Sequence, residues 1–289
     1  MKELVIISGK GGTGKTSITA SFATLAKNAV LADCDVDAAD LHLILRPETQ
    51  QTHPFYSGHK AVVRQPDCVG CGLCQALCRF EAVKEIGGIF RIDPASCEGC
   101  GVCVHFCPAK AIDFPERLCG EWFLSKTRYG TMVHARLGIG AENSGKLVST
   151  VRSQAKQVAT AIQADWILVD GPPGTGCPVI ASLTGADAVL AVTEPTLSGQ
   201  HDLLRVLELT RHFQIPAFVC VNKWDINPAM TATIEAAATS VGATVLTRIP
   251  YDKSITEAQI NGQSVVEYSD GTASQFIQTL WEKLCQLLQ

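Results

Sequence analysis

The feature that most restricts this chain is a duplicated set of cysteines in its first half. The spacing C-x₂-C-x₂-C-x₃-C occurs twice, 29 residues apart (97 − 68), and accounts for eight of the thirteen cysteines: Cys68, Cys71, Cys74, Cys78 and Cys97, Cys100, Cys103, Cys107. The other five are scattered, as small buried residues would be: Cys34, Cys119, Cys177, Cys220 and Cys285. This repeat predicts a small module with internal two-fold similarity.

The N-terminal sequence and the composition indicate the cellular compartment of the protein and therefore the redox state of its thiols. Residues 1–9 form a short apolar run that carries Glu3, which does not fit a signal peptide, and no stretch reaches the roughly 18–20 apolar residues that span a bilayer. We expect a cytoplasmic protein without a membrane span, where thiols stay reduced and clustered cysteines indicate metal binding. The formal net charge of −4 gives no reason to expect nucleic acid as a partner.

Outside the cysteine repeat, short apolar runs alternate with amphipathic stretches. The runs are rich in Val, Ile, Leu and Ala, as strands buried on both faces are: residues 4–8, 29–32, 166–170, 188–193 and 218–222. Residues 146–163 place apolar side chains at a 3.6-residue period, which predicts a helix. Alternating strands and helices predict an α/β fold with a mostly parallel sheet and helices on both faces.

The cysteine repeat interrupts this alternation. We predict that residues 60–117 are a small α+β domain inserted into the larger α/β domain, whose two parts are residues 1–59 and 118–289. After the insert, residues 121–125 and 131–137 are strand-like, and the polar, glycine-rich residues 138–145 predict a loop.

The first apolar run leads into a glycine-rich loop. It fits the Walker A pattern and is followed by a predicted helix over residues 17–27: Gly9, Lys10, Gly11, Gly12, Thr13, Gly14, Lys15, Thr16 and Ser17. Glycines let backbone N–H groups turn around phosphate oxygens, and a helix N-terminus favours negative charge. Lys15 would reach the β- and γ-phosphates, and the Thr16 hydroxyl would ligate Mg²⁺. The alternative, a glycine-rich turn without a ligand, fits less well between a strand and a helix.

The early lysine, Lys10, makes this loop resemble the deviant Walker A of the MinD/ParA/Mrp superfamily of ATPases, which includes the nitrogenase iron protein. The resemblance covers nearly the whole chain. It implies that Lys10 reaches the partner subunit's phosphates in a nucleotide-sandwich dimer. It also implies that Asp35 positions the attacking water and that Asp33 lies near the Mg²⁺ shell. Strand-end caps are the alternative for these two aspartates.

Three later segments match the same family in order. Residues 166–176 resemble Walker B running into switch II, which implies that Asp170 holds a Mg²⁺-bound water and that the Gly174 backbone N–H senses the γ-phosphate. Asn222 matches the base-recognition asparagine, and Pro250 and Asp252 match the late loop near the adenine. The resemblance therefore implies ATP and Mg²⁺ as cofactors and slow ATP hydrolysis, with these catalytic residues: Lys10, Lys15, Asp35 and Asp170.

The cysteine spacing resembles that of bacterial two-cluster ferredoxins, in which each [4Fe–4S] cluster takes three thiolates from one repeat and the fourth from the other. The resemblance implies one cluster on Cys68, Cys71, Cys74 and Cys107, and a second on Cys78, Cys97, Cys100 and Cys103. Zinc is the alternative, but zinc sites need four ligands and not two interlocked sets. Arg79 stands where proline usually follows the fourth cysteine, either as a surface arginine or as a charge that raises that cluster's potential.

Together these motifs favour an ATPase whose nucleotide cycle is coupled to electron transfer to a redox or metalloprotein partner. The resemblance implies a nucleotide-dependent homodimer, or a heterodimer with a related ATPase. An assembly factor that delivers clusters or metal is the first alternative, although the late C-x-x-C of Mrp-like relatives is absent. A MinD-like positioning protein is less favoured, because residues 274–289 have an apolar face with only Lys283 for positive charge, as a core-packing helix would.

Two segments leave their roles open. Cys177 follows switch II, where it is either a partner contact linked to nucleotide state or a buried thiol at a helix start. The polar residues Glu142 to Lys146 are either a partner contact or a solvated loop.

Overall fold

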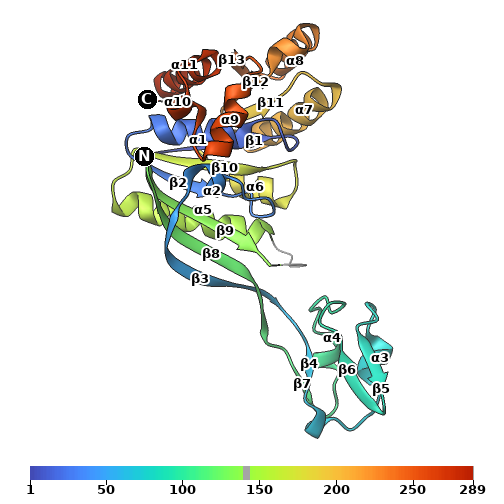
Figure 1. The fold of residues 1–289 in the computed structure, drawn as a ribbon. Helices are drawn as coiled ribbons and strands as arrows, with labels where there is room; N and C mark the ends of the chain where they lie inside the picture. Colours follow the sequence, from blue (N-terminus) through green and yellow to red (C-terminus); the bar gives the residue numbers. More distant parts are fainter. Residues whose placement is uncertain (139–143, 289) are drawn as a thin grey trace. The chain divides into compact units, whose positions relative to one another are not determined.

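The computed structural model describes residues 1–138 and 144–288 (Figure 1). The described residues fall into two compact units. The larger unit contains residues 1–53, 121–137 and 144–288, and the smaller unit contains residues 54–120 and Gly138. The loop predicted at residues 138–145 falls mostly outside the described residues, as do Glu142 and Asn143 of the segment whose role was left open.

The larger unit is built on a nine-stranded sheet with the order β13-β12-β11-β1-β10-β2-β9-β8-β3. All ladders from β13 to β9 are parallel. These strands are β1 (Lys2–Ser8), β2 (Ala29–Asp33), β9 (Gly130–Leu137), β10 (Trp166–Pro173), β11 (Ala188–Thr193), β12 (Ala217–Asn222) and β13 (Thr244–Ile249). The predicted α/β fold with a mostly parallel sheet is confirmed.

The register of the sheet brings the ends of three central strands to one edge. Asp170 of β10 pairs with Ile6 of β1 on one side and with Asp33 of β2 on the other. Because parallel strands end at the same edge, the two aspartates lie beside the loop that follows Ser8. Their position is thus set by backbone pairing.

Helices cover both faces of this sheet (Figure 1). One face shares a hydrophobic core with α1 (Lys15–Leu25), α2 (Leu41–Leu45), α10 (Val265–Tyr268) and α11 (Thr272–Leu287), and it contains alternate strand residues such as Leu4, Ile6 and Leu168. Their neighbours in sequence point to the opposite face, because side chains alternate along a strand. There the strands contact α5 (Ser144–Ala161), α6 (Cys177–Leu183), α7 (Leu197–His212) and α8 (Pro228–Ser240). The short α9 (Lys253–Asn261) contacts α2 and α10.

The C-terminal helix α11 turns its apolar face into the core. Ile277, Leu280, Trp281 and Leu284 are buried there, as predicted for a core-packing helix. Within the described residues, no helix combines the length and the apolar character needed to cross a membrane.

The two strands β3 (Glu48–His59) and β8 (Glu116–Thr127) have residues in both units. The predicted domain boundary at 59/60 falls at the end of β3, and the one at 117/118 falls inside β8. Residues 121–125 and 131–137 lie in β8 and β9, in agreement with their strand-like sequence. The sequence analysis did not predict β3, whose residues are mostly polar and exposed.

The smaller unit repeats one small motif. Each cysteine repeat runs through a left-handed glycine, Gly72 or Gly101, into a short helix: α3 (Leu73–Leu77) or α4 (Val102–His105). Two antiparallel strand pairs accompany these helices: β4 (Val62–Val63) with β7 (Ile112–Asp113), and β5 (Val83–Ile86) with β6 (Ile89–Ile92). Both glycines have positive φ angles, which explains why no larger residue occupies either position.

Candidate functional site

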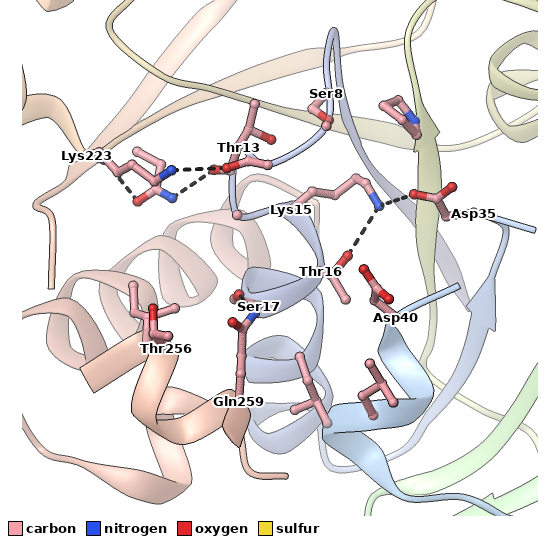
Figure 2. Close-up of a pocket in the computed structure, with 18 of the residues that line it drawn as sticks. Ser8, Thr13, Lys15, Thr16, Ser17, Asp35, Asp40, Lys223, Thr256 and Gln259 are labelled. Carbon is pink, nitrogen blue, oxygen red and sulfur yellow. Dashed lines mark hydrogen bonds and ion pairs between the residues drawn. The ribbon is translucent and has the colours of Figure 1, made fainter. Parts of the chain in front are cut away.

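The loop between β1 and α1 lines a cavity of about 630 Å³ (Figure 2). The cavity gathers most residues predicted to bind nucleotide: Gly11, Gly12, Thr13, Gly14, Lys15, Thr16, Ser17, Asp35, Asn222, Pro250 and Asp252. Five predicted residues are not among those lining it: Gly9, Lys10, Asp33, Asp170 and Gly174. The cavity has the size of small-molecule sites in general.

The Gly14 backbone is held in a conformation that only glycine adopts easily. Its φ angle is 92° at the start of α1, and a Cβ atom there would lie 2.4 Å from the Asn222 amide nitrogen. That nitrogen donates a 2.8 Å hydrogen bond to the Thr13 carbonyl. The loop is therefore fixed by contacts from β12, far away in sequence.

We expect Gly14→Ala to weaken nucleotide binding about tenfold or more while the chain still folds. A left-handed alanine costs about 1–2 kcal/mol, and the new methyl must displace Asn222 or the loop. Calorimetric titration with Mg-ADP measures the affinity. Gly185→Ala is the matched control, because Gly185 has φ +77° but open space around its Cβ. If Gly14→Ala and the control bound Mg-ADP with equal affinity, the methyl group at position 14 would not disturb the nucleotide site.

Lys15 occupies the centre of a buried polar cluster. Its Nζ atom lies 3.0 Å from Asp170 Oδ1 and 3.5 Å from Asp35 Oδ2. The hydroxyls of Thr16 and Thr19 also donate to Asp170, at 2.8 and 3.0 Å. Asp170 is fully buried, so the Lys15 ammonium balances its charge while the two hydroxyls satisfy its oxygens by hydrogen bonding. Figure 2 shows Lys15 reaching toward Asp35 and Thr16.

The carboxyl groups of this cluster compete for one lysine. Burial would lower the pKa of Lys15, but Asp170 and Asp35 outweigh it and raise that pKa above its ordinary value. Burial raises the pKa of Asp33 well above its usual range, and Asp170 adds to the effect. Asp33 Oδ2 is buried and has no hydrogen-bond partner. An orphaned buried oxygen beside two other carboxyl groups is an environment that an added cation would stabilise.

The far side of the cavity is formed by β12, α9 and the segment between β13 and α9. Asn222 uses both ends of its amide within the chain, since its Oδ1 atom accepts from the Lys223 N–H at 3.0 Å and its Nδ2 atom donates to the Thr13 carbonyl. The Asp252 carboxylate caps α9 by accepting from the Ser254 N–H at 2.9 Å. This capping role accounts for the residue without a ligand.

Sequence reasoning missed part of this wall. Gln259 on α9 donates a 2.7 Å hydrogen bond to the Ser17 hydroxyl, which joins α9 to the first turn of α1 (Figure 2). Several apolar and polar neighbours complete the lining: Leu43, Ile44, Tyr251, Ile255, Thr256 and Ile260. The four residues from Tyr251 onward had proximity to Pro250 and Asp252 as their only sequence signal, and Leu43 and Ile44 of α2 had none, because helical spacing alone does not reveal which face meets a ligand.

Two predicted phosphate-sensing groups have partners within the chain. The Gly174 N–H donates to the Ser8 carbonyl at 2.9 Å, at the end of β1. Lys10 forms a 2.6 Å ion pair with Glu194. Cys177 is exposed at the start of α6, which rules out the alternative that it is a buried thiol.

The smaller unit contains two cavities lined by four cysteines each. One is lined by Cys68, Cys71, Cys74 and Cys107, and the other by Cys78, Cys97, Cys100 and Cys103. Each cavity therefore takes three cysteines from one repeat and one from the other. Phe90 packs against Gly72 at the first cavity, and Phe114 packs against Gly101 at the second.

The thiols within each cavity influence one another. Burial raises the pKa of Cys74, and its neighbours Cys68 and Cys71 raise it further. Burial likewise raises the pKa of Cys103, and Cys97 and Cys100 add to that effect. All eight thiols are free of disulfides. Across the part of the chain that the structure describes, no three His, Cys, Asp or Glu side chains are grouped to hold a metal ion.

A phosphate-type loop between a central parallel strand and a helix, with an acidic cluster at the strand ends, defines a P-loop nucleotide-binding protein. Comparison with known families places residues 4–265 in the CobQ/CobB/MinD/ParA nucleotide-binding domain. The chain belongs to this family.

Individual relatives match nearly the whole chain. The uncharacterized protein MJ0578 of Methanocaldococcus jannaschii is 30% identical and covers 99% of this chain and 97% of its own length. The uncharacterized protein MJ0579 of the same organism is 27% identical and covers 93% of this chain and 94% of its own length. Among solved structures, the septum site-determining protein MinD of Pyrococcus horikoshii, complexed with Mg-ADP, has a TM-score of 0.61 at 18% identity. The match covers 99% of this chain and 96% of the MinD chain. This last similarity concerns the fold.

Proposed function

We propose that this protein binds and slowly hydrolyses ATP as a nucleotide-dependent dimer, and that this cycle controls electron transfer through two [4Fe–4S] clusters to a partner protein. The observation that carries the proposal is the composition of the two cysteine cavities, each drawing its fourth thiol from the other repeat. That is the ligand pattern of two-cluster ferredoxins. It occurs in a chain of a nucleotide-binding family.

In the nucleotide site, the chain's own groups would exchange partners. Lys15 would leave Asp170 for the phosphates, and the Thr16 hydroxyl and Asp170 would hold Mg²⁺ with Asp33 nearby. Mg²⁺ takes only one or two carboxylates besides phosphate and water, so these aspartates need not converge on one point beforehand. Asp35, at the cavity wall, would orient the attacking water.

The cysteine cavities fit clusters better than single ions. A tetrahedral zinc site needs four ligands within about 2.3 Å of one point. Each cavity instead takes its fourth thiol from the other repeat, so the two ligand sets interlock as in two-cluster ferredoxins. A four-iron cluster is larger than one ion and holds its thiolates further apart. When bound, such clusters supply one-electron transfer.

Anaerobic purification followed by iron and sulfide analysis tests this function. We expect about eight irons per chain from two four-iron clusters, and an EPR signal of reduced clusters that changes when Mg-ATP is added. Electrons from an external reductant should then pass to a co-purifying partner faster with ATP than without it. Colourless, iron-free protein, or protein that binds no adenine nucleotide, would refute the proposal.

Cluster delivery is the second candidate, and the exposure of Cys71 and Cys100 favours it. Exposed ligands make a cluster easier to exchange. The late cysteines do not help a carrier, because Cys220 is completely buried and its pKa is raised by burial alone. Loss of iron to an apo-acceptor upon ATP addition, without electron transfer, would favour delivery.

A further inference from the structure

The Lys10 ammonium contacts three side-chain oxygens near the end of β11. Its Nζ atom lies 2.6 Å from Glu194 Oε1, 3.2 Å from Thr196 Oγ1 and 3.1 Å from Ser198 Oγ. An ammonium group has three donors, and here each has an acceptor. Glu194 and Thr196 belong to the segment that joins β11 to α7, and Ser198 belongs to the first turn of α7. Lys10 is therefore held against its own subunit, away from the cavity wall.

Glu194 shares its charge between two lysines. While Oε1 binds Lys10, Oε2 lies 3.3 Å from the Nζ atom of Lys223. Lys223 also donates to the Gly12 carbonyl at 3.1 Å, and its backbone has a positive φ of 55°. Burial would raise the pKa of Glu194, but hydrogen bonds from Lys10 and Lys223 lower it below the ordinary value. The carboxylate is thus charged and doubly paired.

We propose that Glu194 is a positioning residue that retains Lys10 on its own subunit until the nucleotide-dependent dimer forms, and that Lys223 then remains as the counter-ion of Glu194. This inference rests on the proposed dimer, in which Lys10 acts across the interface. It adds a role for Lys10 in the monomer, because its contact with Glu194 sets how readily the dimer assembles.

The shared pairing makes the release reversible. A carboxylate stripped of its sole partner in a partly buried site would be costly, whereas Glu194 keeps Lys223 beside its second oxygen. Lys10 itself is 29% exposed at its side chain, so it leaves without disturbing the core. The two hydroxyls of Thr196 and Ser198 would be left to water and to each other, 3.3 Å apart.

Sedimentation velocity of the full chain with Mg-ATP tests this role. We expect Glu194→Gln to dimerise at about tenfold lower protein concentration than the wild type, as when the competent fraction of each of the two subunits rises about threefold. Ser198→Ala, which removes one neutral acceptor, should shift the midpoint in the same direction by about twofold. Lys10→Ala combined with Glu194→Gln should lose the gain. Glu121→Gln is the matched control, because it removes an ion pair with Arg136 between β8 and β9, which the strands β1, β10 and β2 separate from β11.

Nucleotide binding and thermal unfolding are measured on the same samples. If the wild type dimerises while Glu194→Gln and Ser198→Ala dimerise no better, the retaining role of Glu194 is overturned and the proposed function stands. A wild type that binds ATP yet stays monomeric at every concentration would overturn both. Should Glu194→Gln prove unstable, Glu194→Asp takes its place, because the shorter side chain keeps its charge but no longer reaches Lys10 at 2.6 Å.

Discussion

Lys15→Ala is expected to reduce Mg-ATP binding by about a hundredfold or more and to eliminate ATP hydrolysis, because it removes the ammonium that we propose to contact the β- and γ-phosphates. The same change leaves Asp170 fully buried with only two hydroxyl donors. Breaking a buried pair in this way costs about 3–5 kcal/mol at most, so the melting temperature should also fall. Calorimetry and a phosphate-release assay measure the two functional effects.

Two comparisons separate binding from stability in this experiment. Lys27→Ala, an exposed lysine just after the same helix, should bind nucleotide like the wild type. Lys15→Ala combined with Asp170→Asn removes the uncompensated charge, so it should regain stability without regaining nucleotide binding. Wild-type affinity in Lys15→Ala would mean that the cavity beside α1 is not the nucleotide site.

Cys107→Ala is expected to lower the iron content from about eight to about four per chain. The cluster lost should be the one on Cys68, Cys71 and Cys74, although these belong to the other repeat, because all four thiols line one cavity. Iron analysis and EPR of anaerobic protein measure the loss. Cys285→Ala is the control, because that thiol lies in the larger unit, beside its hydrophobic core.

Double variants reveal which cysteines act together. Adding Cys68→Ala to Cys107→Ala should cause no further loss of iron, since both changes damage one cavity. Adding Cys97→Ala should remove the remaining iron, since that cysteine lines the other cavity. The opposite pattern would mean that each repeat binds its own metal, and stoichiometric zinc in place of iron would refute the clusters altogether.

Predictions from the sequence agree best with the structure where a single local pattern of residues specifies the element. Uninterrupted apolar runs such as residues 188–193 are strands buried on both faces, and their pattern needs no partner to be read. The phosphate loop is equally local, since its glycines and Lys15 are adjacent in the chain. The polar strand β3 was missed because its exposed residues show little hydrophobic periodicity.

Some residues of the nucleotide site could be predicted from the sequence, and others could not. Asn222, Pro250 and Asp252 line the predicted cavity, whereas Gln259 was not foreseen. Its hydrogen bond to Ser17 spans 242 residues. The pairing of Lys10 with Glu194 likewise joins β1's loop to the end of β11. Both contacts depend on strand order, which the sequence did not specify.

By itself, the sequence determined the alternation of buried strands and helices, the glycine loop and the two cysteine repeats, because short-range sterics, hydrophobic periodicity and ligand spacing are local properties. Only the tertiary structure decided that Asp33 and Asp170 pair in register on neighbouring strands, that Gln259 reaches Ser17, and that Lys10 is held by Glu194. Those arrangements follow from strand pairing and chain crossing, which bring together residues that no local pattern connects.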